Sequence, residues 1–377
     1  MSTNSSDRKL NIAMLGHKRI PSREGGIEIV VSELTTRMVK LGHNVTCYNR
    51  GGKHVSGSEY GVYTEKEYEG VRLKKVWTVD KKGLAAVSSS IFATICAAFG
   101  NYDVVHFHAE GPCLLCGLPK LFGKKVVVTI HGLDHMRAKW GRFASWYIMR
   151  GEKSAVKHAD SIIVLSKGVQ NYFMDTYGRE TVLIPNGVSE VEPKGTELIS
   201  DRWNLKKDDY ILFLGRMVPE KGVHYLLEAY SRIQTDKKLV IAGGASDSSE
   251  YYASLREKAS AEVIFTDFVQ GQALEELYSN AYIYCLPSDL EGMPLSLLEA
   301  MSYGNACLVS DIPECADVVE DKAAIFAHGD IDDLTKVLQN LCDNPEKVAD
   351  YKKNSSKFIT EKFNWNRVTE DTLRLYV

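Results

Sequence analysis

The sequence predicts an α/β protein built of two doubly wound, parallel-sheet domains that face each other across a cleft. Three observations lead to this prediction. The chain of 377 residues is long enough for about two domains that each bury a core. Short runs of Val, Ile and Leu recur along it, each followed by a longer amphipathic segment, which is typical of repeated βαβ units. These runs are continuous rather than alternating, as expected of parallel strands buried on both faces.

The first half of the chain alternates between the two kinds of segment. Its apolar runs predict strands at Asn11–Leu15, Val45–Tyr48, Arg72–Trp77, Asp103–Phe107, Lys125–Ile130, Ser161–Leu165 and Val182–Ile184. The amphipathic segments between them predict helices at Val30–Leu41, Leu84–Phe99, Gly141–His158 and Lys167–Tyr177. Strands and helices that alternate in this way form a parallel sheet with helical crossovers.

One segment, Gly83–Tyr102, carries no charge and has the length of a membrane span. Several serines, Thr94 and many alanines make it only mildly apolar, and it runs into the strand Asp103–Phe107 without a charged flank. We therefore interpret it as a buried helix before a strand.

A change of character after Pro185-Asn186-Gly187 marks the domain boundary. Residues Val188–Asp209 are polar and charged, without apolar periodicity. Further strands are predicted at Tyr210–Leu214, Lys238–Ala242, Val263–Phe265, Ala281–Leu286 and Ala306–Val309, with helices at Val223–Ile233, Ser249–Ala259, Leu274–Asn280, Pro294–Tyr303 and Ile331–Cys342. We assign residues 1–190 to a first domain, 191–362 to a second and 363–377 to a terminal segment. Ligands of doubly wound sheets bind beyond the carboxyl ends of the strands, which puts the expected site in the cleft.

Composition excludes several classes of function. A net charge of -3 and a pI near 6.4 provide no general attraction to nucleic acid. The first residues lack the apolar core of a secretory signal, so we expect a cytoplasmic protein whose eight cysteines are reduced. Cys113 and Cys116 lie among leucines with no second pair at zinc spacing, and we interpret them as core residues.

The most informative segment runs from Ser288 to Met301. A turn follows the strand Ala281–Leu286, and Pro294 is expected at the first helical position, where its missing N–H costs nothing. The N-terminus of that helix suits a phosphate, and Gly292 lets the backbone approach it. Glu291 and Glu299 would then accept hydrogen bonds from sugar or ribose hydroxyls.

A second segment of this domain supplies positive charge. Gly215 to Gly222 follows the strand Tyr210–Leu214 and contains Arg216 and Lys221, which could bind a diphosphate. The alternative for both segments is a capped helix and a surface turn with solvated charges.

The first domain offers two strand-end features. A loop from Gly16 to Glu28 with the pair Gly25-Gly26 follows the first strand, but it lacks the G-x-G-x-x-G dinucleotide pattern. His131, next to Gly132, follows the strand Lys125–Ile130 and is expected to project into the cleft, although a lone histidine is often structural.

Taken in order, these motifs resemble the retaining glycosyltransferases of family 4, whose GT-B architecture consists of two Rossmann-like domains. The resemblance covers nearly the whole chain. The N-terminal half is most similar to bacterial enzymes of capsule, O-antigen and exopolysaccharide synthesis, including rhamnosyltransferase-like members. Its carriers are Gly25 to Glu28, His131 to Leu133, Asp160 to Ser166, Ile184 to Val188, Gly215 to Gly222 and Glu291 to Met301.

The resemblance implies transfer of a sugar from a nucleoside diphosphate to an acceptor hydroxyl with retained configuration. The first domain would bind the acceptor and the second the donor. Arg216 and Lys221 match the family's diphosphate-binding pair, and Glu291 and His131 the residues that contact the donor sugar; we assign these as catalytic. The implied substrate-binding residues are Gly25, Gly26, Asn186, Gly215, Gly292, Met293, Pro294, Leu295 and Glu299.

The resemblance also implies that neither a metal nor another cofactor is needed, because the two cations and the helix terminus stabilise the leaving diphosphate. We expect front-face displacement, in which the diphosphate accepts the proton of the acceptor. Donors that carry UDP, GDP or dTDP all fit the resemblance. A glycoside hydrolase using Glu291 and Glu299 and a non-catalytic nucleotide-sugar binding protein stay open as alternatives, whereas the pattern does not match a sugar-nucleotide epimerase.

A helical projection of residues 139–157 suggests an acceptor-side surface. It gathers positive charge in one stripe, with Phe143 and Tyr147 beside it. Such a face suits peripheral contact with the anionic inner face of the plasma membrane, or a polyprenyl-diphosphate-linked acceptor; the alternative is a solvated helix face. The stripe consists of Lys139, Arg142, Trp146, Arg150, Lys153 and Lys157. The terminal segment resembles the family's last helix, which returns to the first domain, where Trp365 would anchor it.

Overall fold

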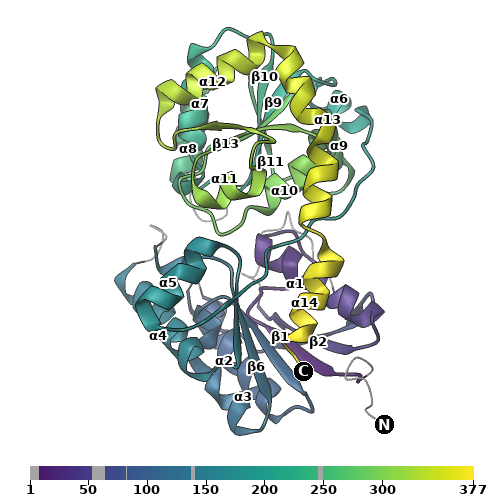
Figure 1. Ribbon diagram of the computed structural model, residues 1–377, viewed down its shortest axis with the longest axis vertical. Coiled ribbons are helices and arrows are strands. Elements are labelled where there is room, and N and C mark those ends of the chain that lie inside the picture. Colours follow the sequence, from purple (N-terminus) through teal and green to yellow (C-terminus); the bar gives the residue numbers. More distant parts are fainter. Residues whose placement is uncertain (1–7, 53–63, 82, 137–140, 245–248) are drawn as a thin grey trace. The chain divides into compact units, whose positions relative to one another are not determined.

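The computed structural model describes residues 8–52, 64–81, 83–136, 141–244 and 249–377. The chain forms two compact units, one of residues 1–186 together with 365–377 and one of residues 187–364 (Figure 1). The boundaries expected from sequence lay at 190/191 and 362/363. Each unit is an α/β domain with its own sheet, as the fold class predicted.

The sheet of the N-terminal unit has the order β3-β4-β2-β1-β5-β6-β7-β8. Every neighbouring pair is parallel except β3 with β4. The strand order reverses around the central β1, where Ile12 is paired with Val45 on one side and Val104 on the other. The strands are β1 (Asn11–Leu15), β2 (Asn44–Arg50), β3 (Glu67–Tyr68), β4 (Val71–Val76), β5 (Val104–His108), β6 (Lys125–Ile130), β7 (Ser161–Val164) and β8 (Val182–Leu183).

Helices cover this sheet and bury its central strands. They are α1 (Gly26–Lys40), α2 (Leu84–Phe99), η3 (Gly111–Leu115), α3 (Gly117–Leu121), η4 (Asp134–Met136), α4 (Arg142–His158) and α5 (Lys167–Tyr177). The predicted start of α1 at Val30 was wrong. Gly25 is an extended N-cap and Glu28 lies in the first turn, where a carboxylate favours the helix dipole although the glycine pair disfavours helix by itself.

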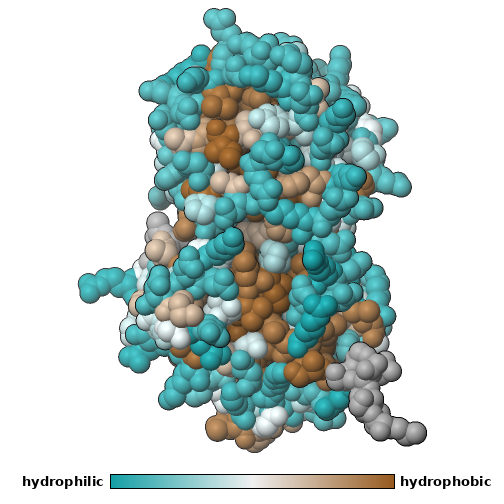
Figure 2. Space-filling model, in the orientation of Figure 1, coloured by the Kyte–Doolittle hydropathy of each residue, from teal (hydrophilic) through white to brown (hydrophobic). Residues whose placement is uncertain are grey.

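The uncharged segment forms the predicted helix α2 over Leu84–Phe99. Its Ser and Ala face is buried, and the hydroxyls of Ser90 and Thr94 donate to helix carbonyls at 2.7 Å. The opposite face exposes Phe92, Ile95 and Phe99, so the helix is buried on one side only. The exposed Phe99 ring packs on Phe122, which follows α3. Figure 2 shows apolar surface among the polar surface of the protein. Among the described residues, no helix has the length and apolarity of a membrane span.

Cys113 and Cys116 are core residues, as predicted. Both are fully buried in the cluster that also contains Phe107, Ile130 and Phe173. Burial raises the pKa of the Cys116 thiol, so neither cysteine has the setting of a reactive thiolate.

The C-terminal unit has a fully parallel sheet of order β11-β10-β9-β12-β13-β14. Its strands are β9 (Tyr210–Leu214), β10 (Lys238–Ala242), β11 (Val263–Asp267), β12 (Ile283–Leu286), β13 (Ala306–Ser310) and β14 (Ala324–Phe326). Its helical elements are α6 (Glu197–Trp203), η5 (Pro219–Lys221), α7 (Val223–Arg232), α8 (Ser249–Lys258), α9 (Gln272–Asn280), α10 (Leu295–Ser302), α11 (Pro313–Val319), α12 (Ile331–Asp343) and α13 (Pro345–Lys362).

Several elements here were not predicted, among them α6, α11, β14 and the long α13. Helix α6 lies in the segment that appeared aperiodic. The amides of Leu198 and Ile199 at its start donate to the buried carboxylate of Glu276 at 2.8 and 3.0 Å. A residue distant in sequence therefore caps this short helix, so the local sequence around the helix could not predict the cap.

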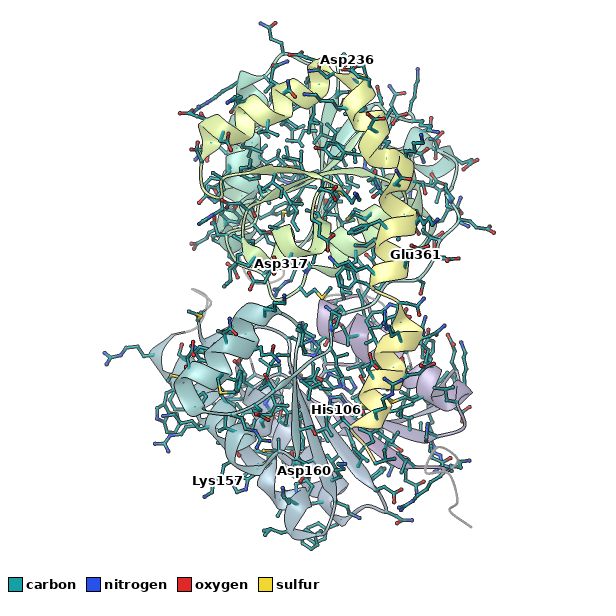
Figure 3. All side chains as sticks on the ribbon, in the orientation of Figure 1. His106, Lys157, Asp160, Asp236, Asp317 and Glu361 are labelled. Carbon is teal, nitrogen blue, oxygen red and sulfur yellow. The ribbon has the colours of Figure 1, made fainter. Side chains whose placement is uncertain are left out.

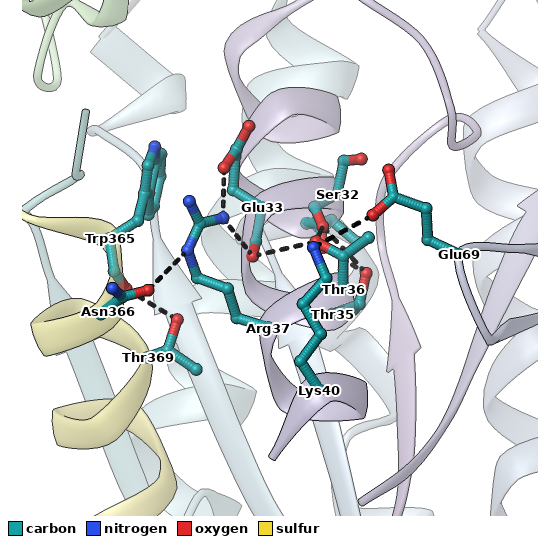
Figure 4. Close-up of polar contacts among 11 residues, drawn as sticks. Ser32, Glu33, Thr35, Thr36, Arg37, Lys40, Glu69, Trp365, Asn366 and Thr369 are labelled. Atoms are coloured by element: carbon teal, nitrogen blue, oxygen red, sulfur yellow. Dashed lines mark hydrogen bonds and ion pairs between the residues drawn. The ribbon is translucent and has the colours of Figure 1, made fainter. Parts of the chain in front are cut away.

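The last helix, α14 (Trp365–Arg374), belongs to the N-terminal unit. Figure 4 shows its contact with α1, in which Arg37 Nε donates to Asn366 Oδ1 at 3.1 Å. Trp365 is buried, and the Tyr376 hydroxyl lies 2.5 Å from Nδ1 of His106, which Figure 3 labels beside α14. The chain end is thus fastened to β5 and α1.

Candidate functional site

In the C-terminal unit, two loops meet at the carboxyl ends of β9 and β12, which are neighbours in the sheet. The amide of Asp289 donates to the carbonyl of Glu220 at 2.9 Å and joins them. Gly222 has a φ of +66°, and a Cβ at this position would lie 1.8 Å from the carbonyl oxygen of Pro287. Only glycine permits this close approach of the two loops.

Lys221 and Glu291 form an ion pair where the loops meet. Lys221 Nζ lies 2.5 Å from Glu291 Oε1, and the side chains are 13% and 8% exposed. The Ser288 hydroxyl donates to the same oxygen at 2.7 Å. A largely buried cation and carboxylate are thus held together at the strand ends, and Ser288 is a positioning residue that the sequence analysis missed.

Arg216 lies half-buried in the loop after β9. Its guanidinium makes no hydrogen bond or ion pair with any residue that the structure describes. The loop backbone is fixed because Gly215 donates to Ala242 at 3.0 Å and Met217 to Gly244 at 3.3 Å. A Cβ at Gly243 would lie 1.9 Å from the carbonyl of Gly215. Gly243, at the end of β10, is a further residue that sequence reasoning missed, although its position after a predicted strand was a usable signal.

The N-terminus of α10 differs by one residue from the prediction. Pro294 is the N-cap, with φ of −75° and ψ of 105°, and the helix begins at Leu295. Its extended ψ places it outside the helix. The amides of Gly292, Leu295 and Ser296 donate to no acceptor within the described part of the chain. These are the unsatisfied donors that make a helix N-terminus an anion site. Gly292, Met293, Pro294 and Leu295 are all buried.

Glu299 lies in the second turn of α10 and is half-buried. The Tyr278 hydroxyl donates to its Oε2 at 3.2 Å. The Tyr278 ring is itself stacked on Tyr303 at 5.4 Å. The structure therefore holds Glu299 through a tyrosine of α9 that the sequence did not single out.

In the N-terminal unit, Gly25 and Gly26 begin α1 beside two buried carboxylates. The amide of Lys18 donates to Glu28 Oε1 at 2.8 Å, and Arg19 Nε donates to Glu24 Oε1 at 3.0 Å. A Cβ on Gly25 would lie 2.9 Å from Glu28 Oε2. Gly25 is thus the last residue of the loop and the N-cap of α1, and Gly26 is the first residue of the helix.

His131 follows β6 and approaches a second histidine. Nδ1 of His108 and Nε2 of His131 lie 3.0 Å apart, and the two rings are stacked. Burial, followed by the charges of His106, His131 and His17, holds the pKa of His108 well below its usual value. A neutral histidine of the neighbouring strand therefore orients His131. Asn186, another predicted site residue, is buried at the end of this unit.

The predicted cationic stripe exists on α4 except for Lys139, which lies outside the described residues. Arg142, Trp146, Arg150, Lys153 and Lys157 are exposed, and the Arg150 guanidinium lies 5.3 Å from the Trp146 ring centroid. Phe143 is 75% exposed and stacks on Trp146. Tyr147 is partly buried, and its ring lies near Gly111. Membrane contact through this face stays a prediction.

Comparisons with known proteins give the class of protein. Residues 24–191 match the family model Glycosyltransferase Family 4, and residues 196–358 match Glycosyl transferases group 1. The alpha-maltose-1-phosphate synthase of Mycolicibacterium smegmatis is 25% identical, over 97% of this chain and 99% of its own. The solved sucrose-phosphate synthase from Thermosynechococcus elongatus has a TM-score of 0.79 at 19% identity, covering 98% of each chain. Anabaena HepE, solved with UDP and glucose, has a TM-score of 0.78 at 14% identity, over 97% of this chain and 98% of its own.

The two Rossmann-like units thus define a protein of the GT-B fold. The two matched models lie one on each half of the chain, the first over the N-terminal unit and the second over the C-terminal unit. The chain is therefore a glycosyltransferase.

Proposed function

We propose that the protein transfers a sugar from a nucleoside-diphosphate sugar to an acceptor hydroxyl with retention of anomeric configuration. One observation carries the proposal: Lys221, Arg216 and the free amides at the start of α10 are gathered at neighbouring strand ends of the C-terminal unit. Two cations and a helix N-terminus are the groups that a diphosphate requires. The glycosyltransferase relatives, including the structure solved with UDP and glucose, support a nucleotide-sugar donor.

In this proposal Arg216 and Lys221 stabilise the charge that develops on the leaving diphosphate. Glu291 accepts hydrogen bonds from the donor sugar, and Glu299 from the ribose of the nucleotide. The leaving diphosphate oxygen takes the proton of the acceptor on the face from which it departs, so no protein nucleophile is needed. The protein contributes position and electrostatic stabilisation. The cations take the role that a metal has in other transferases, and the donor reaction is proposed to need none.

We assign His131 and the Gly25-Gly26 pair to the donor's sugar and phosphates, and Asn186 to the same substrate. These assignments rest on the resemblance of the motifs to family 4. The orientation of His131 by a neutral His108 favours a hydrogen-bonding role for the imidazole.

The alternative function, a glycoside hydrolase, requires one carboxylic acid to protonate a leaving group. Glu291 accepts hydrogen bonds from Lys221 and Ser288, which are the partners of an ionised carboxylate. This arrangement favours hydroxyl binding over acid catalysis.

For the acceptor we propose a saccharide hydroxyl on a lipid-linked intermediate of bacterial surface polysaccharide synthesis. In this proposal the cationic stripe of α4 contacts the anionic membrane surface. The mycobacterial relative is named for a sugar phosphate product. A sugar phosphate is therefore the second acceptor to test, beside the lipid-linked saccharide.

A thermal-shift screen with UDP, GDP and dTDP identifies the donor base. A nucleotide at 100 times its dissociation constant stabilises the fold by about 2.7 kcal/mol. NMR of the product made with the matching sugar nucleotide then gives the anomeric configuration. Inversion would refute retention, whereas release of free sugar without acceptor would favour the hydrolase.

A further inference from the structure

Three metal-ligating side chains converge in the N-terminal unit, apart from the residues assigned to sugar transfer. Glu110 follows β5, His135 lies in η4 and Glu152 lies in α4. One ligand atom of each residue lies within 4.8 Å of the other two. His135 Nδ1 is 3.4 Å from Glu152 Oε2 and 3.9 Å from Glu110 Oε1.

These three atoms are buried and have no hydrogen-bond partner in the described part of the chain. The side chains of Glu110 and Glu152 are 0% exposed. A buried polar atom without a partner is rare in native proteins, because its lost hydration is not replaced. Three such atoms that face one another indicate a missing common partner.

The remaining oxygen of each carboxylate is already held. The Asp134 amide donates to Glu110 Oε2 at 3.0 Å. The hydroxyls of Tyr172 and Tyr177 donate to Glu152 Oε1 at 2.9 and 2.5 Å. Each carboxylate therefore presents one fixed oxygen to the centre, as metal ligands do when outer hydrogen bonds orient them.

The backbone brings these elements close together. A Cβ at Gly151, which precedes Glu152, would lie 2.1 Å from the carbonyl oxygen of Glu110. Ala109, which precedes Glu110, has a φ of +73°, a left-handed conformation that is uncommon for a residue with a side chain. The fold thus maintains both a close approach and an unfavourable turn at this point.

The types of ligand atom at this cluster indicate which cation would bind there. Two buried carboxylates at this separation repel each other unless a proton or a cation lies between them. An imidazole nitrogen with two carboxylate oxygens suits Zn²⁺, whereas Mg²⁺ and Ca²⁺ prefer oxygen ligands alone. We propose that Glu110, His135 and Glu152 bind a divalent transition-metal cation of the zinc type, which links α4 to the loops after β5 and β6.

The role of this cation is structural, separate from the diphosphate chemistry. It would fix the segment that continues from His131 to His135, together with the helix that carries the cationic stripe. The metal proposal can be tested independently of the donor assignment, because its readouts are metal content and thermal stability.

The test uses the whole chain, purified without chelator. We expect about one Zn²⁺ per chain by elemental analysis, and anomalous scattering at the zinc edge between these three residues in a crystal. After treatment with EDTA, we expect the Tm to rise by about 5–10 °C on titration with Zn²⁺, and to stay unchanged with Mg²⁺.

The variants Glu110→Gln and His135→Gln should lose the Zn²⁺-dependent rise in Tm. His328→Gln in the C-terminal unit is the matched control, since His328 Nδ1 lies 2.7 Å from Asp311 Oδ1 in a simple exposed pair, and this variant should keep the rise. If one site variant does not fold, the other still gives the result.

Two outcomes would overturn the proposal. One is a Zn²⁺-dependent rise in Tm that survives in Glu110→Gln and His135→Gln. The other is an absence of binding to the wild type, with Glu110→Gln more stable than the metal-free wild type, which would show that a proton and not a cation lies between the carboxylates.

Discussion

Lys221 places its ammonium 2.5 Å from Oε1 of Glu291, although 70 positions separate the two residues in the chain. The pairing occurs because β9 and β12 are neighbours and their loops cross at Gly222. It concentrates a buried positive charge next to the start of α10, and it gives the proposed donor site several measurable consequences.

Replacing either proposed diphosphate-binding cation should slow turnover. We expect Arg216→Ala and Lys221→Ala each to lower kcat by about 10²–10³, because each removes a donor to the developing charge. Far-UV circular dichroism and Tm should show an intact fold for Arg216→Ala, whose side chain has no partner among the described residues. Arg232→Ala, which breaks exposed ion pairs with Glu228 and Asp332 outside the proposed site, is the control. Full activity in both site variants would remove the diphosphate assignment.

Glu291→Gln should separate nucleotide binding from transfer. The amide can still accept from Ser288 but no longer neutralises Lys221, so we expect the free nucleoside diphosphate to bind a few-fold more tightly, by about 1 kcal/mol. Transfer should fall, because the sugar loses a charged acceptor. Calorimetry and initial rates measure the two effects. Weaker nucleotide binding in this variant would contradict the proposed role of the ion pair.

Gly222→Ala should disturb the meeting of the two loops. The added methyl group would lie 1.8 Å from the Pro287 oxygen, in addition to the left-handed φ. We expect a loss of at least about 2–3 kcal/mol in the free energy of unfolding, together with weaker nucleotide binding.

Gly304→Ala provides the matched control for this change. Gly304 also has a positive φ, of +81°, but nothing lies within 4 Å of a Cβ there. It should cost only about 1–2 kcal/mol and leave nucleotide affinity unchanged. Equal effects of the two substitutions on affinity would show that the close approach to Pro287 is unimportant.

Buried His17 should make the stability depend on pH. Burial, opposed by the hydrogen bond to Asn49 and reinforced by the charge of Arg50, lowers the pKa of His17 from 6.5 to about 4. Between these values the unfolded chain binds more protons than the folded one, so stability is complete above pH 6.5 and is lost as the pH falls. We expect this residue to contribute a loss of about 2 kcal/mol between pH 7 and pH 5.

Denaturant unfolding of the wild type and His17→Asn at the two pH values measures this contribution. The variant should be less stable at pH 7 but show the smaller change with pH. An identical change in both proteins would contradict the assignment.

The stripe on α4 can be tested by flotation with anionic vesicles. We expect Arg142→Glu, Arg150→Glu and Lys153→Glu together to abolish binding at low salt, because each basic residue near such a surface contributes about 1 kcal/mol. The control carries three charge reversals in α13, Lys347→Glu, Lys353→Glu and Lys357→Glu. If the wild type does not bind at low salt, the membrane prediction fails.

Much of the fold could be predicted because its signals are local. Strand β6 and helix α2 have the bounds that their composition indicated. Helix α1 began four residues earlier than predicted, because the glycine pair disfavours helix locally while the fold accepts it there. Helix α6 was missed because its cap is Glu276, about 80 positions away.

For the candidate site, the sequence named residues but gave none of the contacts between them. Arg216, Lys221 and Glu291 were singled out because each lies in a loop after a predicted strand, and Glu299 because it lies in the predicted helix that follows Glu291. Ser288 and Tyr278, which hold the two carboxylates, gave no comparable signal. Serine and tyrosine occur in so many settings that only their neighbours in space reveal a role.

The sequence by itself determined two α/β domains, the positions of most strands and the chemistry available at their ends, because hydropathy period and turn residues act over a few positions. The tertiary structure alone decided that Lys221 meets Glu291 and that Glu110, His135 and Glu152 converge. These contacts depend on the order of the strands in each sheet, which is set by packing between segments far apart in the chain. The same packing sets the distances between charged groups and their burial, and these determine how strongly the groups interact.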